Sequence, residues 1–181
     1  QIARNLAGPI IAEFRGALLT ALAVLIAAPA LLALALWRIG RRDRAKAQRL
    51  AERVARGGAG LIGVLFLLVA LRIWIDPPAV GQTLGIAAQG PVGLATMRAD
   101  MGGFFGAAGG FALWAAIRRR RVWLLPPLVL LAIALAGRAL TLAVGGFSIV
   151  QLPPMVVEAL CVAVLVWAWR AMRPAAAPQQ G

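Results

Sequence analysis

The sequence contains no histidine, no tyrosine and only one cysteine among its 181 residues. Without histidine, the commonest general base and the usual axial ligand of haem are absent. The single cysteine, Cys161, cannot form an internal disulfide, a CxxC redox pair or a thiolate metal site. We interpret it as a small apolar residue of a helix interior. We therefore predict a protein that is not an enzyme and that carries no cofactor or metal.

Acidic residues are also scarce, with 6 against 19 basic ones, which gives a formal net charge of +13. In a soluble protein this excess would suggest nucleic acid as the partner. Here 62% of the residues are hydrophobic and the mean hydropathy is +0.86, whereas soluble domains are about 45–50% apolar. The basic residues fall in the gaps between apolar runs, which is typical of membrane proteins. We expect membrane lipids as partners, and no nucleic acid.

Five segments are long and apolar enough to span a bilayer, which takes about 20 residues of helix. They cover residues 17–37, 57–75, 99–117, 122–142 and 154–169. Pro29 should kink the first, while Pro126 and Pro127 lie in the first turns of the fourth. The fold class predicted is all-α: a polytopic helical membrane protein with a four-helix bundle plus one N-terminal helix. The domains expected are an arm, first span and basic loop at 1–56, the bundle at 57–173, and a disordered tail at 174–181.

The distribution of lysine and arginine predicts the topology. Residues 38–56, 118–121 and 170–173 hold 14 of the 19 basic residues, and the side with more positive charge is cytoplasmic. Over five spans this places the N-terminus outside and the C-terminus in the cytoplasm of a bacterial inner membrane. Residues 1–16 are predicted to be an amphipathic or irregular arm, and not a secretory signal.

The basic segment 38–56 is predicted to be helical, with one charged face made of Arg42, Lys46, Arg49 and Arg53. Such a face binds anionic lipid headgroups. It could serve lipid-specific or partner binding, or topology and surface adhesion alone, and we favour the second interpretation.

Small residues recur along the third span. Gly102, Gly106 and Gly110 repeat every four residues, and Gly103 lies beside them in a second row with Ala99 and Ala107. In lipid, small residues let helix backbones approach and gain van der Waals contact. We expect this helix to be the central one of the bundle, packed within the chain, with self-association as the alternative.

Six charges lie outside the basic loops at predicted span ends: Arg72, Asp76, Arg98, Asp100, Arg138 and Glu158. Three are positive and three negative, and the topology places all of them near the outer face. Charges at membrane depth are costly and persist when they are paired or line water. We predict that Arg138 and Glu158 face the bundle interior and interact, directly or through water.

The cluster could be a ligand-binding pocket on Arg98, Asp100, Arg138, Glu158 and Arg72, or a network that locks helix ends together, which we favour. The intervening residues 76–97 are predicted to be a loop with a short helix near 80–88, folded back as a lid or, preferably, a plain cap.

Residues 57–170 resemble an uncharacterised bacterial family of four-helix integral membrane domains, loosely similar to the DoxX type. The resemblance depends on the segment RADMGG at 98–103, the pair Gly137 and Arg138, and Glu158. It implies an all-helical bundle and no established activity.

Three functions stay open. The first choice is an accessory or assembly subunit that docks on other membrane-protein subunits or on itself. The second is a binder or carrier of a lipid or small apolar ligand that uses the outer charged pocket. The third is a small proton-coupled transporter, which the lack of polar residues in the inner halves of the spans opposes.

Overall fold

The computed structural model describes residues 43–146 and 151–172, and these residues form helices without any strand. The all-α class predicted from the sequence is therefore confirmed for this part of the chain. The first predicted span, with Pro29, lies outside the described residues. The chain divides into two compact units, Gln1–Leu50 and Ala51–Gly181, and the packing described below is that of the second unit.

The helix α2 (Arg44–Ile75) includes both the end of the basic segment and the whole second predicted span. Asp43 caps its first turn, because the Asp43 carboxylate accepts hydrogen bonds from the backbone N–H groups of Ala45 and Lys46 at 3.0 Å. The helical prediction for the basic segment is confirmed over its described part. Gly57 and Gly58 do not interrupt the helix, although glycine weakens a helix interior.

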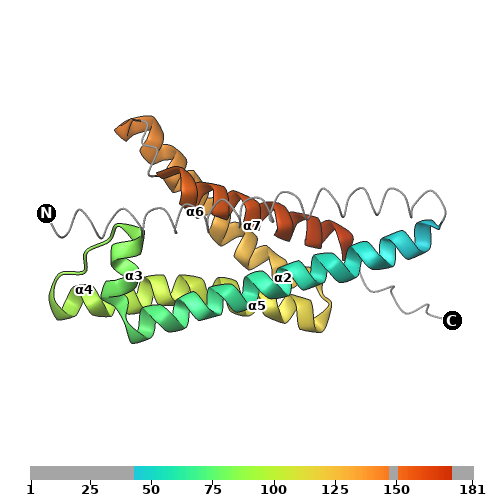
Figure 1. The fold of residues 1–181 in the computed structure, drawn as a ribbon, viewed down its shortest axis with the longest axis horizontal. Helices are drawn as coiled ribbons and strands as arrows, with labels where there is room; N and C mark the ends of the chain where they lie inside the picture. The colour runs from blue at the N-terminus through green and yellow to red at the C-terminus, as the bar shows by residue number, and fades with distance from the viewer. Residues whose placement is uncertain (1–42, 147–150, 173–181) are drawn as a thin grey trace, which may run out of the picture. The chain divides into compact units, whose positions relative to one another are not determined.

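The predicted loop at 76–97 contains two short helices, α3 (Pro77–Leu84) and α4 (Gly90–Thr96). Gly85 ends α3 in the left-handed conformation, with φ +72°. Figure 1 shows the extended segment that joins the two. The predicted short helix near 80–88 corresponds to α3, which begins three residues and ends four residues earlier, because Asp76, Pro77 and Pro78 form its N-terminus. The second helix, α4, was not predicted.

The third predicted span continues from α4 without interruption. A π-helical turn, η1 (Met97–Met101), leads into α5 (Gly102–Arg118). The residues Arg119 and Arg120 reverse the chain, with Arg119 at φ +56°. A short helix η2 (Arg121–Leu124) then opens α6 (Leu125–Gly145), and the last helix is α7 (Leu152–Ala171). Both α6 and α7 carry two prolines in their first turn, and those of α6 are the predicted pair Pro126 and Pro127.

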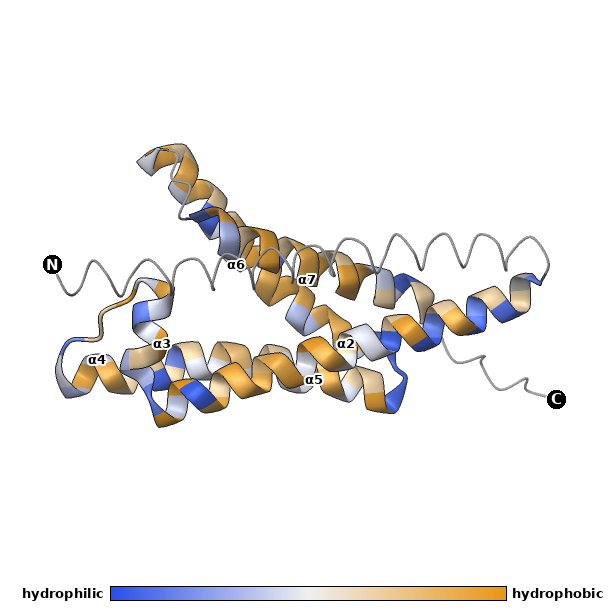
Figure 2. Cartoon of the chain, viewed as in Figure 1, coloured by the Kyte–Doolittle hydropathy of each residue, from blue (hydrophilic) through white to orange (hydrophobic). Residues whose placement is uncertain are grey.

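Three helical stretches of the described residues are long and apolar enough to cross a membrane: Ala45–Ile75, Arg121–Gly145 and Leu152–Ala171. α5 is shorter, at 17 residues. Figure 2 shows that α6 and α7 are apolar over most of their length, whereas polar and apolar residues alternate in the first half of α2.

The buried core lies where the middle of α2 meets the second half of α5, η2, the first half of α6 and the end of α7. It consists largely of alanine and leucine, including Ala59, Ala112, Leu131 and Leu165. Many large apolar side chains remain outside it, among them Leu61, Ile133 and Leu140 at more than 60% exposure. Apolar surface of this extent requires lipid or protein to cover it.

Candidate functional site

The pair Arg138 and Glu158 joins α6 to α7. Nε of Arg138 donates to both carboxylate oxygens of Glu158, at 2.9 and 3.0 Å. The Arg138 side chain is 36% exposed and the Glu158 side chain 18%. The direct interaction predicted between these two residues is therefore confirmed, and the pair lies at the edge of the helix interface.

The pair lies deeper along its helices than the sequence indicated. α6 extends to Gly145 and α7 begins at Leu152, beyond the predicted limits at 142 and 154. At 1.5 Å per residue, each charged residue lies about 10 Å, or two turns, from the nearer helix end. The sequence had suggested one turn. Both helices therefore continue with apolar residues on either side of the pair.

Arg98 makes a different contact, with the end of α2. Nε of Arg98 donates to the backbone carbonyl of Trp74 at 3.0 Å, and the indole N–H of Trp74 donates to the carbonyl of Arg98 at 3.1 Å. Gly102 lies directly against the same indole and leaves no space for a Cβ atom. These two hydrogen bonds connect the π-helical turn η1 to the end of α2. The sequence did not indicate this contact, because backbone acceptors leave no residue pattern.

The other charges of the predicted cluster are separate from these two contacts. Asp76 caps α3 by accepting the backbone N–H of Ala79 at 3.3 Å. Arg72 and Asp100 are exposed. Among the described residues, ion pairs form only between Lys46 and Asp43 and between Arg138 and Glu158. The predicted six-charge set therefore does not form one ion-pair network in this part of the chain.

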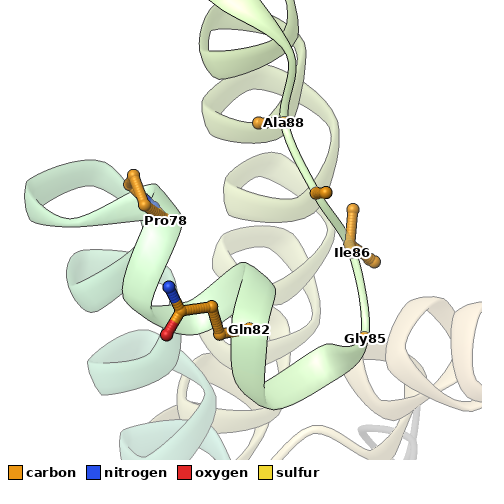
Figure 3. Close-up of a pocket in the computed structure, with 6 residues that line it drawn as sticks. Pro78, Gln82, Gly85, Ile86 and Ala88 are labelled. Carbon is orange, nitrogen blue, oxygen red and sulfur yellow. The ribbon is translucent and has the colours of Figure 1, made fainter.

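Two hollows lie elsewhere, and no charged residue lines either. One, of about 330 Å³, lies between α3 and the extended segment after it, and is lined by Pro78, Gln82, Gly85, Ile86, Ala87 and Ala88. Figure 3 shows the lining residues Pro78 and Gln82 on α3, and Ile86 and Ala88 on the extended segment that follows Gly85. The other, of about 370 Å³, is lined by Gly106, Ala107, Gly110, Phe111, Trp114 and Trp123. Neither adjoins the ligand-binding set that the sequence suggested.

The glycines of α5 divide between two faces. A Cβ atom on Gly109 would lie 2.8 Å from the carbonyl oxygen of Gly63, and one on Gly63 would lie 2.6 Å from the backbone nitrogen of Leu113. The backbones of α2 and α5 therefore touch at this crossing. Gly102 and Gly106 lie on the same side, next to Trp74 and Ala70.

Gly103 and Gly110, by contrast, have no described neighbour within 4 Å of a Cβ position. The four-residue repeat therefore coincides with the packed face only at Gly102 and Gly106, whereas Gly110 departs from it and the closest approach to the α2 backbone is at Gly109. No sequence signal on α5 alone distinguishes Gly109, since its role depends on the opposing Gly63.

The basic face of α2 is exposed at Lys46, Arg49 and Arg53, while Arg42 lies outside the described residues. Cys161 is half-buried in α7 as a free thiol. In residues 43–146 and 151–172, histidine, cysteine and carboxylate side chains form no group of three that could hold a metal ion.

No protein-family model matches the chain, and no curated protein and no solved structure matches it either. The similarity to the four-helix membrane family therefore stays a prediction.

Proposed function

We propose that the chain is an integral membrane protein that serves as an accessory or assembly subunit of a larger membrane complex. In this proposal five spans cross a bacterial inner membrane, with the N-terminus outside and the C-terminus in the cytoplasm. The three described stretches able to cross a membrane support the membrane part of the proposal. The assembly part depends on Arg138.

The observation that carries it is the hydrogen-bonding state of the Arg138 guanidinium. Arginine has five N–H donors. Within residues 43–146 and 151–172 the Nε–H of Arg138 donates to the Glu158 carboxylate, and the four donors on its two Nη atoms have no acceptor in this part of the chain. Lipid tails offer no acceptor, and unsatisfied polar groups at membrane depth cost several kcal/mol each. A carbonyl or carboxylate of a neighbouring subunit would satisfy these donors.

The exposure of the two helices around the pair also supports an assembly role. Of the 18 most apolar residues of each stretch, only 6% are buried in Arg121–Gly145 and 11% in Leu152–Ala171. A polar pair on two largely uncovered helices specifies where a partner helix binds, because polar groups in lipid favour interhelical hydrogen bonds. The pair and the adjacent exposed surface of α6 together form the proposed subunit interface.

The two alternatives have less support. A ligand pocket in the outer cluster requires a cavity beside Arg98, Arg138 and Glu158, and both hollows described above lie elsewhere. Proton transport requires a polar path across the membrane, and the inner halves of the predicted spans contain almost no polar residue.

The mass of the native particle tests the proposal. The full chain is extracted from its own membranes in a mild detergent and analysed by native mass spectrometry. We expect a particle well above the 18.9 kDa of one chain, and dissociation of that particle in the variant Arg138→Leu. A clean monomer from the unmodified chain, under conditions that preserve other membrane complexes, would contradict the proposal.

A cross-linking experiment locates the interface. Thr141 is exposed and lies one turn after Arg138 on the same side of α6, while Leu140, 65% exposed, lies on the opposite side. A photoreactive residue at 141 should give protein adducts in the native membrane, and the matched control at 140 should give mainly lipid adducts. The reverse result would place the partner on the other face and remove Arg138 from the interface.

A further inference from the structure

The hollow on α5 combines an apolar wall with a floor of small residues. Gly106, Ala107 and Gly110 provide the floor, and Phe111, Trp114 and Trp123 the rest of the lining. The rings of Phe111 and Trp123 stack with centroids 5.8 Å apart, which holds one wall in place. At about 370 Å³, the hollow falls in the range of about 300–1,000 Å³ typical of ligand pockets.

Aromatic rings hold two arginines in place near the C-terminal end of α5. The guanidinium of Arg118 lies 4.5 Å from the ring centroid of Trp114, and that of Arg121 lies 4.7 Å from that of Trp169. A guanidinium stacked on an indole face keeps its N–H edge available for a phosphate. Trp114 thus belongs to the hollow and also positions a cation beside it.

The charge at this end is of one sign. Arg118, Arg119, Arg120 and Arg121 are consecutive, and none of them forms an ion pair with a carboxylate among the described residues. The hollow therefore has an apolar interior and an anion-attracting rim.

We infer that this hollow binds one anionic phospholipid of the adjacent leaflet, with an acyl chain against Gly106 and Gly110 and the phosphate on Arg118. The amphipathic structure of such a lipid matches the arrangement of the site, and basic pockets between membrane helices bind anionic headgroups. A second copy of the chain fits less well, because a symmetric contact would bring two sets of four arginines together.

Lipid titration tests the inference. The full chain in detergent is mixed with phosphatidylglycerol or with phosphatidylcholine of the same acyl chains, and bound lipid is counted by native mass spectrometry. We expect one phosphatidylglycerol to bind at concentrations at which phosphatidylcholine does not. Equal binding of the two lipids would overturn the inference.

Arg118→Gln is the charge variant, and Arg120→Gln is its control because it removes the same charge from the same run of four arginines. Loss of one charge-assisted hydrogen bond, worth about 1.5–3 kcal/mol, should weaken the first lipid about tenfold or more in Arg118→Gln. The control should weaken it much less. Equal weakening in both variants would indicate attraction to net charge and would contradict a defined site.

Gly110→Leu fills the hollow, and Gly103→Leu places the same side chain on α5 outside the hollow. Both positions have open space around a Cβ atom, so both variants should fold, which circular dichroism checks. The first should lose the bound phosphatidylglycerol and the second should retain it. Retention in Gly110→Leu, or loss of a dimer instead of a lipid, would overturn the inference.

Discussion

The contact between α2 and α5 differs in kind from the contact between α6 and α7. The first has a crossing at which backbone meets backbone, with Gly63 and Gly109 opposed. The second carries the ion pair of Arg138 and Glu158 at its edge, and few residues of its helices are buried. The contact between α2 and α5 has no space for a side chain larger than hydrogen at Gly63 or Gly109. The contact between α6 and α7 retains exposed apolar surface and Arg138 N–H donors that have no acceptor among the described residues.

The difference indicates which contact stabilises the fold and which one is available to a partner. Close approach of backbones gains van der Waals contact and depends on shape alone. A partly exposed ion pair fixes the relative position of two helices and can still accept another partner. We therefore assign stability mainly to the α2 and α5 crossing and association mainly to α6 and α7. Three variants test this assignment.

Gly109→Ala should have the largest effect on stability. Its added methyl group would lie 2.8 Å from the Gly63 carbonyl oxygen and 2.9 Å from the backbone nitrogen of Leu67, so one helix must move. Overpacking of this kind costs about 1–3 kcal/mol, which unfolding in bicelles would measure. Gly103→Ala, in open space, is the control and should not destabilise the chain. Equal stability of the two variants would show that the crossing is not close-packed in the membrane.

The double variant Arg138→Leu with Glu158→Leu should be more stable than Glu158→Leu alone. Removing the carboxylate leaves a guanidinium without its partner, whereas removing both groups leaves an apolar interface. We expect a coupling of only about 1 kcal/mol, as for other polar pairs between membrane helices, below the value of about 3–5 kcal/mol for breaking buried pairs. Unfolding free energies of all four proteins form the cycle. Strict additivity would mean that the pair contributes nothing to the folded chain.

Trp74→Phe should have the smallest effect. It removes the indole donor to the Arg98 carbonyl and keeps most of the apolar ring, so the expected loss is about 0.5–1.5 kcal/mol. Faster hydrogen exchange should be confined to η1 and the start of α5. Trp114→Phe serves as the comparison, since its indole N–H makes no hydrogen bond to a described residue. Faster exchange throughout α5 in Trp74→Phe would place more of the stability at this end than the structure indicates.

The apolar runs predicted most of the helices because hydropathy and length alone decide which segments can span a bilayer. Helix ends were harder. The predicted end at 142 is three residues early, since the apolar residues after Leu142 continue the helix to Gly145. Only one of the two helices within 76–97 was predicted, because both are short and depend on caps and prolines that periodicity does not detect. The Asp76, Pro77 and Pro78 sequence was the available signal.

For the candidate site, opposite charges on two adjacent spans were enough to predict the contact between Arg138 and Glu158. The contact between Arg98 and Trp74 could not be predicted, since both acceptors are backbone carbonyls. Nor could the role of Gly109. Which side of α5 faces α2 depends on the rotation of both helices, and a four-residue repeat on one of them does not determine it.

The proline pairs that open α6 and α7 affect the hydration of these helix ends. A helix begins with four N–H groups that lack an internal partner, and two prolines in the first turn remove two of them. No side chain caps the N-terminus of α7, and at the start of α6 the N–H of Leu125 already donates to the Val122 carbonyl of η2. With fewer donors that require water or a cap, each of these ends can lie within the headgroup layer at a lower dehydration cost. The start of each helix can therefore shift in depth with the thickness of the surrounding bilayer.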